Sequence, residues 1–235
     1  MQYKRIMLKL SGEALGESGW LFDHQQIGAV ARVIQAVAAR GIQVGVVIGG
    51  GNLWRGRRGA AAGMDGVRAD QMGMLGTLMN CLIMQDALDQ LGVRAQMFSA
   101  LHVPDICANY RRDLADEALR RDGVALFGGG LGNPFFTTDT AVALRALELK
   151  AEALLLAKNV DGVYTADPNL DPKAQLIRDI SYAEAIRQGL KVMDMSAFLM
   201  CLEQGLPQVR VFGLSHPDNI LRVLDGFDLG TTLHP

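Results

Sequence analysis

The sequence predicts an α/β fold in which a mostly parallel sheet carries helices on both faces. Short runs of β-branched residues and leucine alternate along the chain with longer amphipathic segments, a pattern typical of parallel sheets. Three of the short runs end in glycine-rich loops, one of them in Val44–Gly56, "VGVVIGGGNLWRG". The 235 residues are 49% hydrophobic and 20% charged, which suits a single globular domain over 1–235 and excludes a disordered or fibrous chain.

Strands are predicted where short apolar runs are bounded by turn residues. In chain order they are Arg5–Leu10, Ile42–Ile48, Arg94–Phe98, Val124–Phe127, Ala153–Ala157 and Gln208–Phe212. Between the last two, residues 161–175 are rich in aspartate, proline and asparagine, and they predict a long excursion or a hairpin.

Helices are predicted from apolar residues at helical spacing and from capping residues at the ends. They cover Asp23–Arg40, Met64–Leu91, Asp113–Arg121, Thr138–Lys150, Ser181–Gln188 and Asp194–Gly205, and a last one begins near Pro217. The longest carries a stripe of Met72, Leu75, Met79, Leu82 and Ile83, which we interpret as core packing.

Charge and composition exclude several classes of partner. A net charge of −2 makes no electrostatic case for nucleic acid or an acidic membrane surface, and no apolar run approaches the roughly 20 residues that span a bilayer. The four histidines are scattered, so they predict no metal site. Cys81, Cys107 and Cys201 are odd in number and far apart, which favours free thiols in a reducing, cytoplasmic compartment.

Three glycine-rich loops follow predicted strands, so they should lie together at one edge of a parallel sheet. The loops are Lys9–Gly12 ("KLSG"), Gly49–Asn52 ("GGGN") and Gly128–Pro134 ("GGGLGNP"). Glycine lets backbone N–H groups turn toward an anion, and Lys9, Arg55 and Lys158 fall near the same strand ends. The cluster favours one or two ligands that carry several phosphates. Neither the P-loop motif G-x-x-x-x-G-K-[ST] nor the dinucleotide motif G-x-G-x-x-G occurs, so the site is of another kind.

Six motifs spread over essentially the whole chain carry a family resemblance. They are "KLSGEAL", "GVVIGGGNLWRG", "ADQMGML", "GNPFFTTDT", "VDGVYTADP" and "KVMD", in this order. Together they resemble the bacterial uridylate kinases (UMP kinases), a branch of the amino acid kinase superfamily. The resemblance implies a three-layer α/β/α sandwich and the ATP-dependent conversion of UMP to UDP in pyrimidine nucleotide biosynthesis, with Mg²⁺ accompanying ATP. It also implies a homohexamer with GTP and UTP as allosteric effectors, an N-terminal part that binds UMP, and a part from about residue 150 that binds ATP.

The resemblance also assigns residues to the ATP side. The phosphates fall to Lys9, Leu10, Ser11 and Gly12, and Gly51 and Arg55 contact the same nucleotide. The adenosine falls to Lys158, Asn159, Tyr164 and Asp167. Since a phosphate acceptor is already an anion, in-line transfer needs no general base, and positioning and charge neutralisation carry the catalysis. Lys9 and Arg55 are then the expected transition-state cations. Asp139 and Asp161 either orient a lysine or hydrated Mg²⁺, or are plain cap and turn residues.

The UMP side is assigned in the same way. Gly50 approaches the UMP phosphate and Asp70 the ribose, while uracil and phosphate fall to Leu131, Gly132, Asn133, Pro134, Phe135, Phe136, Thr137 and Thr138. Asp70 could instead cap a helix, Phe135 and Phe136 could belong to the core, and Asp194 of "KVMD" reads equally well as an N-cap. Leu131 stands where the family usually has a small hydroxyl residue, and residues 16–23 overlap the family's activator loop.

Two rival functions remain open at this stage. One is a superfamily kinase that acts on aspartate, glutamate or carbamate, which would share "KLSG" and "GGG" but would not need "GNPFFTTD". The other is a non-catalytic protein that binds a nucleotide or an oxyanion on the same scaffold.

Overall fold

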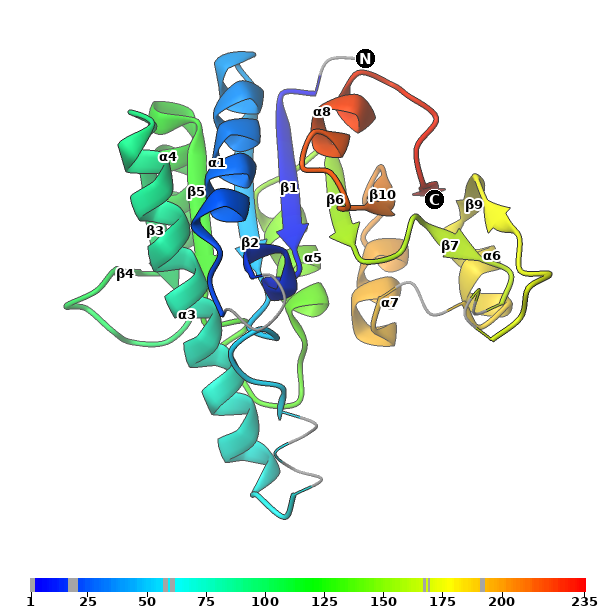
Figure 1. Cartoon of the computed structure of the whole chain (residues 1–235), viewed down its shortest axis with the longest axis horizontal. Helices are drawn as coiled ribbons and strands as arrows, with labels where there is room; N and C mark the ends of the chain where they lie inside the picture. The colour runs from blue at the N-terminus through cyan, green and yellow to red at the C-terminus, as the bar shows by residue number, and fades with distance from the viewer. Residues whose placement is uncertain are drawn as a thin grey trace.

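A nine-stranded sheet runs through the middle of the molecule, with the strand order β4-β3-β5-β2-β1-β6-β10-β11-β9 (Figure 1). The computed structural model describes residues 3–16, 21–56, 59, 62–166, 168, 170–190 and 193–235. Neighbouring strands are parallel except for β10 and β11, which are antiparallel. The strands are β1 (Arg5–Leu10), β2 (Gln43–Ile48), β3 (Ala95–Ser99), β4 (Ala108–Asn109), β5 (Val124–Gly128), β6 (Ala153–Lys158), β9 (Asp179–Ser181), β10 (Val209–Gly213) and β11 (Thr231–His234).

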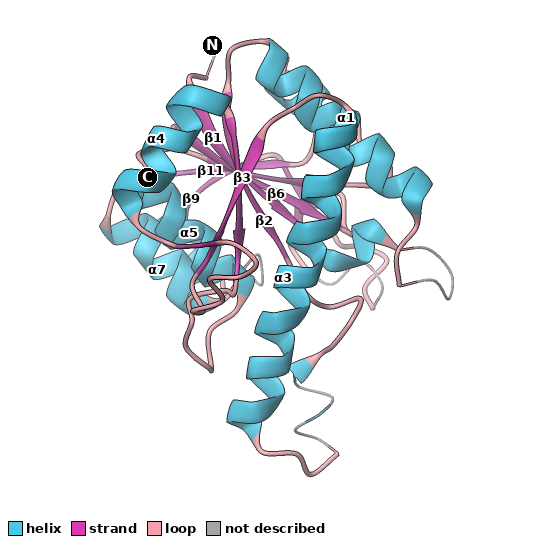
Figure 2. Cartoon of the chain, turned by 90° about the vertical axis from the view of Figure 1, so that its left-hand side faces the viewer, coloured by secondary structure: helices cyan, strands magenta, loops and turns pink. Residues whose placement is uncertain are grey.

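Helices cover both faces of this sheet. They are the short 3₁₀ helix η1 (Gly12–Leu15) and α1 (His24–Ala39), α3 (Gly66–Gln90), α4 (Arg112–Asp122), α5 (Thr138–Glu148), α6 (Tyr182–Arg187), α7 (Met195–Glu203) and α8 (Asn219–Leu224). Helices α1, α3 and α8 pack into one core cluster, and α4, α5, α6 and α7 into a second cluster on the opposite face. Figure 2, which looks along the sheet, shows α1 and α3 on one side of the strands and α4, α5 and α7 on the other. The predicted α/β/α sandwich is therefore confirmed.

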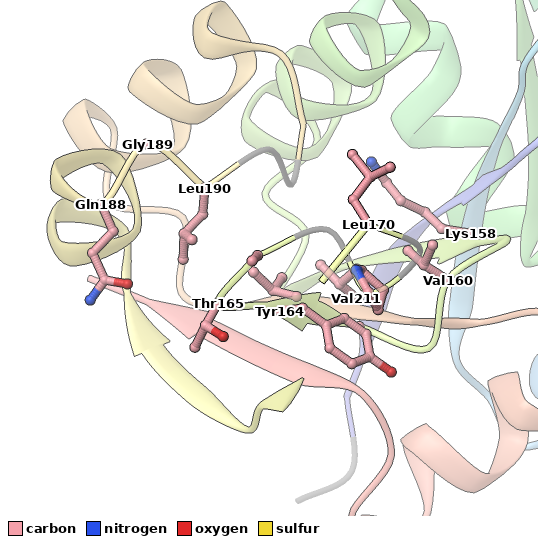
Figure 3. Close-up of a pocket in the computed structure, with 13 residues that line it drawn as sticks. Lys158, Val160, Tyr164, Thr165, Leu170, Gln188, Gly189, Leu190 and Val211 are labelled. Carbon is pink, nitrogen blue, oxygen red and sulfur yellow. The ribbon is translucent and has the colours of Figure 1, made fainter. Parts of the chain in front are cut away.

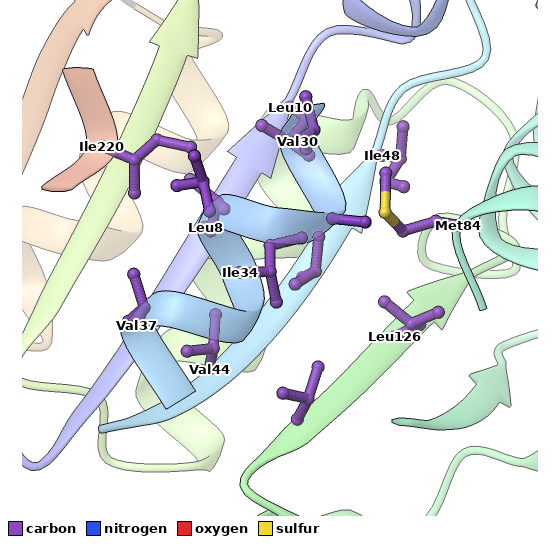
Figure 4. Packing of buried hydrophobic residues seen from close by; sticks show 14 of the residues in the cluster. Leu8, Leu10, Val30, Ile34, Val37, Val44, Ile48, Met84, Leu126 and Ile220 are labelled. Carbon is purple, nitrogen blue, oxygen red and sulfur yellow. The ribbon is translucent and has the colours of Figure 1, made fainter. Parts of the chain in front are cut away.

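Side chains that alternate along β1 contribute to the core clusters on both faces of the sheet. Ile6, Leu8 and Leu10 face α1, whereas Met7 lies in the core beneath α5. Figure 4 shows Leu8 and Leu10 packed against Val30 on α1 and its neighbours. Successive side chains of a strand point to opposite faces, so Lys9 shares the face of Met7 and reaches toward the beginning of α5.

Most predicted elements are present, with boundaries that shift by a few residues. The predicted excursion at 161–175 contributes to a separate two-stranded antiparallel sheet of β7 (Val163–Tyr164) and β8 (Leu176–Ile177). The caps also appear as predicted, because the side chains of Asp23 and Asp194 accept backbone N–H groups at the starts of α1 and α7. The short strands β4, β9 and β11 were not predicted.

The interpretation of the α3 stripe as core packing is wrong for four of its five residues. Met72, Leu75, Met79 and Leu82 are 38%, 50%, 49% and 39% exposed. A second row of apolar side chains on the same helix contacts the sheet instead, and it includes Leu78, Cys81, Met84 and Leu88. Helix α3 thus has two apolar faces, and spacing alone could not say which one is buried. Ile83 is partly buried against the core, as predicted.

Within the described residues, no helix is both long and apolar enough to cross a membrane.

Candidate functional site

The three glycine-rich loops lie at one edge of the sheet. The register pairs Leu10 with Ile48 and Val47 with Phe127, so β1, β2 and β5 all end at the same level. The first loop is joined to the second by a hydrogen bond in which the Gly49 N–H donates to the Leu10 carbonyl at 2.9 Å. Strand β6 ends beside β1, which adds Lys158 to the same edge.

Glycine is required in the second loop because the backbone passes very close to α3. A Cβ atom at Gly50 would lie 2.6 Å from the carbonyl oxygen of Gly73 and 3.2 Å from the Thr77 nitrogen. The buried Asn80 side chain of α3 donates to the Gly49 carbonyl at 2.6 Å and so holds the loop against this helix. This packing leaves the backbone of the loop, rather than side chains, at the edge of the sheet.

A buried carboxylate joins two lysines at this edge. Asp139, the second residue of α5, lies 3.0 Å from the Lys9 ammonium and 3.4 Å from that of Lys158. The three side chains come from β1, α5 and β6, and their exposed fractions are only 13%, 14% and 21%. Asp139 does not cap its helix, since the Thr137 hydroxyl accepts the Asp139 N–H at 3.0 Å. Of the alternatives for Asp139, the geometry favours an orienter of lysine.

The ion pairs decide the charge states in this cluster. Burial alone raises the pKa of Asp139, but attraction to Lys9 and Lys158 outweighs it and holds the pKa below its ordinary value. Burial lowers the pKa of Lys158, and the nearby Lys9 charge lowers it further, while Asp139 acts in the opposite direction. The cluster therefore keeps Asp139 ionised between the side chains of Lys9 and Lys158.

A second carboxylate, Glu13, connects Arg55 to the end of β6. It forms an ion pair with Arg55 and accepts a hydrogen bond of 2.7 Å from the Asn159 amide. Arg55 is about half exposed, and its Nε lies 3.9 Å from where a Cβ at Gly51 would be. The guanidinium is thus held over the glycine loop, with one face toward solvent.

The third loop, which continues into Phe135 and Phe136, contacts α3. The Gly129 N–H donates to the Thr77 hydroxyl at 2.8 Å. Gly132 adopts a positive φ of 78°, and a Cβ at this position would lie only 2.9 Å from the Ala100 carbonyl oxygen. Phe135 also has a positive φ, 69°, which is costly for a residue with a side chain. Its N–H donates to Asp70 Oδ2 at 2.8 Å, and this bond helps hold the unusual conformation.

Asp70 therefore ties α3 to the third loop and does not cap the helix, because Asp65 accepts the Arg68 N–H as the N-cap. Phe135 and Phe136 are 75% and 49% exposed, so the alternative that places them in the core is wrong. They lie at the tip of the loop beside the beginning of α3. A Cβ atom at Gly66, the first residue of α3, would be 3.8 Å from the Phe135 ring.

The two threonines at the start of α5 differ in what their hydroxyls contact. Thr137 donates to Asp194 Oδ2 and accepts the Asp139 N–H, so the single donor of its hydroxyl, the group that a phosphate would need, is already used. The Thr138 hydroxyl lies 3.6 Å from where a Cβ at Gly49 would be, facing the glycine loop. Thr138 is therefore the better placed of the two for a phosphate.

A cavity of about 480 Å³ opens next to this edge. Figure 3 shows Tyr164, Thr165 and Leu170 on one side and Gln188, Gly189 and Leu190 on the other, with Lys158 at one end. Lys158 therefore belongs both to the cavity and to the charged cluster around Asp139. Mostly apolar walls with few polar groups suit a flat heterocycle, and the cationic end suits phosphates.

The remaining predicted site residues within the described part of the chain do not belong to the cluster around Asp139. Leu10 ends β1 and Ser11 and Gly12 follow it at the loop edge, while Leu131, Asn133 and Pro134 complete the third loop. Asp161 is exposed and lies beside Gly213 at the end of β10, whereas the ion pairs of Lys9 and Lys158 described above are formed with Asp139. Asp167, residues 17–20 of the predicted activator loop and residues 191–192 of "KVMD" lie outside the described residues.

Sequence reasoning missed Glu13, Thr77 and Asn80. Glu13 was part of the quoted "KLSGEAL", but nothing in that stretch indicates that its side chain turns toward Arg55. Thr77 and Asn80 are polar residues buried on a helix, with exposed fractions of 3% and 0%. Two polar residues among apolar neighbours could have signalled loop contacts, because buried polar groups need hydrogen-bond partners.

Comparisons with known proteins agree with this geometry. Residues 4–213 match the model of the amino acid kinase family. The chain is similar to a UMP kinase from Bacillus anthracis, with 34% identity, a TM-score of 0.94 and coverage of 100% of this chain and 97% of the other. A UMP kinase from Ureaplasma parvum matches at 34% identity and a TM-score of 0.93, over 100% of both chains. A uridylate kinase from Archaeoglobus fulgidus is 27% identical, with a TM-score of 0.74 and coverage of 99% and 100%. The chain belongs to the amino acid kinase family.

Proposed function

We propose that this protein is a UMP kinase, which transfers the γ-phosphoryl group of ATP to the phosphate of UMP and releases ADP and UDP. One observation carries the proposal: a buried aspartate holds two lysines at the edge where three glycine loops converge. The full-length similarity to two UMP kinases at 34% identity supports the choice of acceptor.

The cavity and the loops suggest where each substrate binds. Adenine occupies the cavity beside Tyr164, and the ATP phosphates extend from Lys158 toward Lys9 and the first two loops. UMP lies on the side of the third loop, with its ribose near Asp70 and its phosphate near Gly50 and Thr138. The second loop then lies between donor and acceptor. This arrangement agrees with an ATP side formed by the chain from about residue 150 and a UMP side formed by the part before it.

Catalysis in this arrangement is electrostatic. Both reacting groups are anions, so the residues that matter neutralise charge and hold the phosphates in line. Lys9 and Arg55 are the transition-state cations, and Asp139 keeps Lys9 directed at the transferred phosphoryl group. No side chain needs to remove a proton, since the acceptor oxygen of UMP is already charged.

Mg²⁺ is proposed to arrive with ATP. Within the residues that the structure describes, no group of three or more histidine, cysteine or acidic side chains could hold a metal ion. Mg²⁺ usually keeps several waters and binds substrate phosphates through few protein ligands. When bound, the ion would neutralise phosphate charge. Asp161, exposed at the same edge, is a candidate to orient its waters.

We expect kcat/KM for UMP to exceed that for CMP by at least about 100-fold. At N3 and at the substituent on C4, uracil and cytosine present opposite donor and acceptor groups, and a site built for one leaves buried polar groups unpaired with the other. A coupled ADP assay with UMP, CMP and dUMP measures the preference, and repeating it with GTP and UTP tests the proposed effectors. Aspartate, glutamate and carbamate serve as acceptors for the rival kinases. Equal rates with UMP and CMP, or turnover of one of the rival acceptors alone, would contradict the proposal, and tight ATP binding without turnover would favour a binding protein.

We also propose that the chain forms a homo-oligomer through the outer face of α3, consistent with the hexamer that the resemblance implies. Met72, Leu75, Met79 and Leu82 recur at intervals of three, four and three residues, the spacing of a coiled-coil seam. A second copy presents the same row of side chains, so the face is complementary to itself.

Sedimentation equilibrium should find the wild-type protein as an oligomer and Leu75→Glu as a smaller species, because a carboxylate in the seam would be buried without a partner. Ile106→Glu, which changes a 52% exposed apolar residue outside α3, is the matched control and should leave the mass unchanged. A monomeric wild-type protein would rule out this interface.

A further inference from the structure

Asp194 lies at the point where the C-terminal half of the chain meets the beginning of α5. We propose that Asp194 is a positioning residue for phosphoryl transfer, which sets the first turn of α5 and through it Thr138 and Asp139. The inference rests on the proposed function, because it assigns Asp194 to the same site.

Both carboxylate oxygens of Asp194 are engaged. Oδ1 accepts the Ala197 N–H at 2.8 Å and so caps α7. Oδ2 accepts a hydrogen bond from the Thr140 hydroxyl at 2.7 Å and another from the Thr137 hydroxyl. A simple N-cap would need only the first of these contacts. The other two cross to a different helix, and Thr140 is almost completely buried.

A continuous hydrogen-bonded path leads from Asp194 to the charged cluster. The Thr137 hydroxyl that donates to Asp194 accepts the Asp139 N–H at 3.0 Å. The side chain of Asp139 then contacts Lys9 at 3.0 Å and Lys158 at 3.4 Å. Moving the first turn of α5 would move the carboxylate that holds both lysines, and it would also move Thr138 relative to Gly49.

The path needs a carboxylate at position 194. Oδ2 receives two hydroxyl donors while Oδ1 receives an N–H, so all three partners donate and the side chain must be an acceptor at both oxygens. Asparagine has nearly the same shape and can still cap α7 through its oxygen. Its NH₂ group would then face the two hydroxyls as a further donor. Thr137 would lose the acceptor that fixes the direction of its hydroxyl, and the cap on Asp139 would loosen.

The test compares Asp194→Asn with variants of Thr137. We expect Asp194→Asn to lower kcat for UMP by at least about tenfold, with KM for ATP within about threefold of wild type because the cavity is intact. Thr137→Val should have a similar effect, and Thr137→Ser, which keeps the hydroxyl, should stay within about threefold of wild type. Because Asp194 and Thr137 act through one hydrogen-bonded path, the double variant Asp194→Asn with Thr137→Val should have a kcat no lower than that of the less active single variant.

Ser181→Ala is the matched control. Ser181 is also an N-cap, on α6, and its hydroxyl accepts the Glu184 N–H at 3.2 Å. Loss of this cap should also lower Tm and leave kcat near wild type. Equal kcat losses in Ser181→Ala and Asp194→Asn, or losses that multiply in the double variant, would show that Asp194 acts only on stability.

Amide hydrogen exchange separates this inference from the proposed function. In Asp194→Asn the Asp139 amide should exchange at least about tenfold faster, while the Ala197 amide stays protected by the remaining cap. Unchanged exchange at Asp139 would overturn the positioning role even if the enzyme phosphorylates UMP. Faster exchange in a protein whose wild type does not use UMP would support the path and refute the assigned reaction.

Discussion

Replacing Lys9 by methionine is expected to lower kcat for UMP phosphorylation by about 10² or more. Methionine keeps roughly the length of the side chain but removes the cation that Asp139 holds at 3.0 Å beside the glycine loops. A charge aimed at the transferred phosphoryl group contributes most in the transition state, so kcat should fall more than KM for ATP rises. Steady-state kinetics with varied ATP and UMP measures both quantities.

Lys4→Met is the control for this substitution. Lys4 precedes β1 at the end opposite the glycine loops, and it is exposed. The same change there should leave kcat and KM near wild type. A Lys9→Met enzyme with a normal kcat and only a raised KM for ATP would mean that Lys9 binds the nucleotide in the ground state and adds nothing to the transition state.

Replacing Asp139 by asparagine should damage both stability and activity. The substitution leaves two largely buried lysines next to each other without their shared counter-ion, and breaking a buried ion pair in this way costs about 3–5 kcal/mol. We expect urea unfolding at pH 7 to show a loss of that size and kcat to fall by about 10² or more, because Lys9 is no longer directed. An Asp139→Asn protein with wild-type stability would show that the two lysines do not depend on it.

The same residue should give the wild type a dependence on acid. Because the folded-state pKa of Asp139 is depressed, its contribution to stability is complete above the ordinary aspartate pKa of about 4 and is lost as pH falls through the depressed value. Asp139→Asn has no such carboxyl, so the stability difference between the two proteins should shrink below pH 4. A difference that stays constant down to pH 2 would contradict the assigned pKa direction.

Local patterns predicted the layers of the fold and the edge that carries the site. Glycine loops after β1, β2 and β5 could be predicted because parallel strands end together, and the caps at Asp23 and Asp194 could be predicted because short polar side chains satisfy free N–H groups. The strands β4 and β9 could not, since two or three residues are too few to show a period and depend on a neighbouring strand for their pairing.

The details of the site depended on contacts between distant parts of the chain. Whether Asp139 would cap a helix or contact a lysine was open until β1 and β6 were placed on either side of it. The second role of Asp194 was hidden for the same reason, because a residue that caps one helix gives no local sign that it also contacts another. The outward face of α3 was missed because both of its faces are apolar, and the choice between them is made by the sheet.

The pairing of β1 with β6 has a consequence for how the protein is made. Ile6 at the start of the chain pairs with Ala153, and these two strands form the centre of the sheet. Contacts between residues so far apart in sequence close late, because a long loop must first be ordered. On the ribosome, β1 and β2 can pair early, but the space beside β1 stays open until the chain beyond Lys158 has emerged. During that interval a strand of Ile, Met and Leu exposes an unpaired edge, which is a template for contact with other chains. The nascent protein is therefore most prone to aggregate before β6 is made.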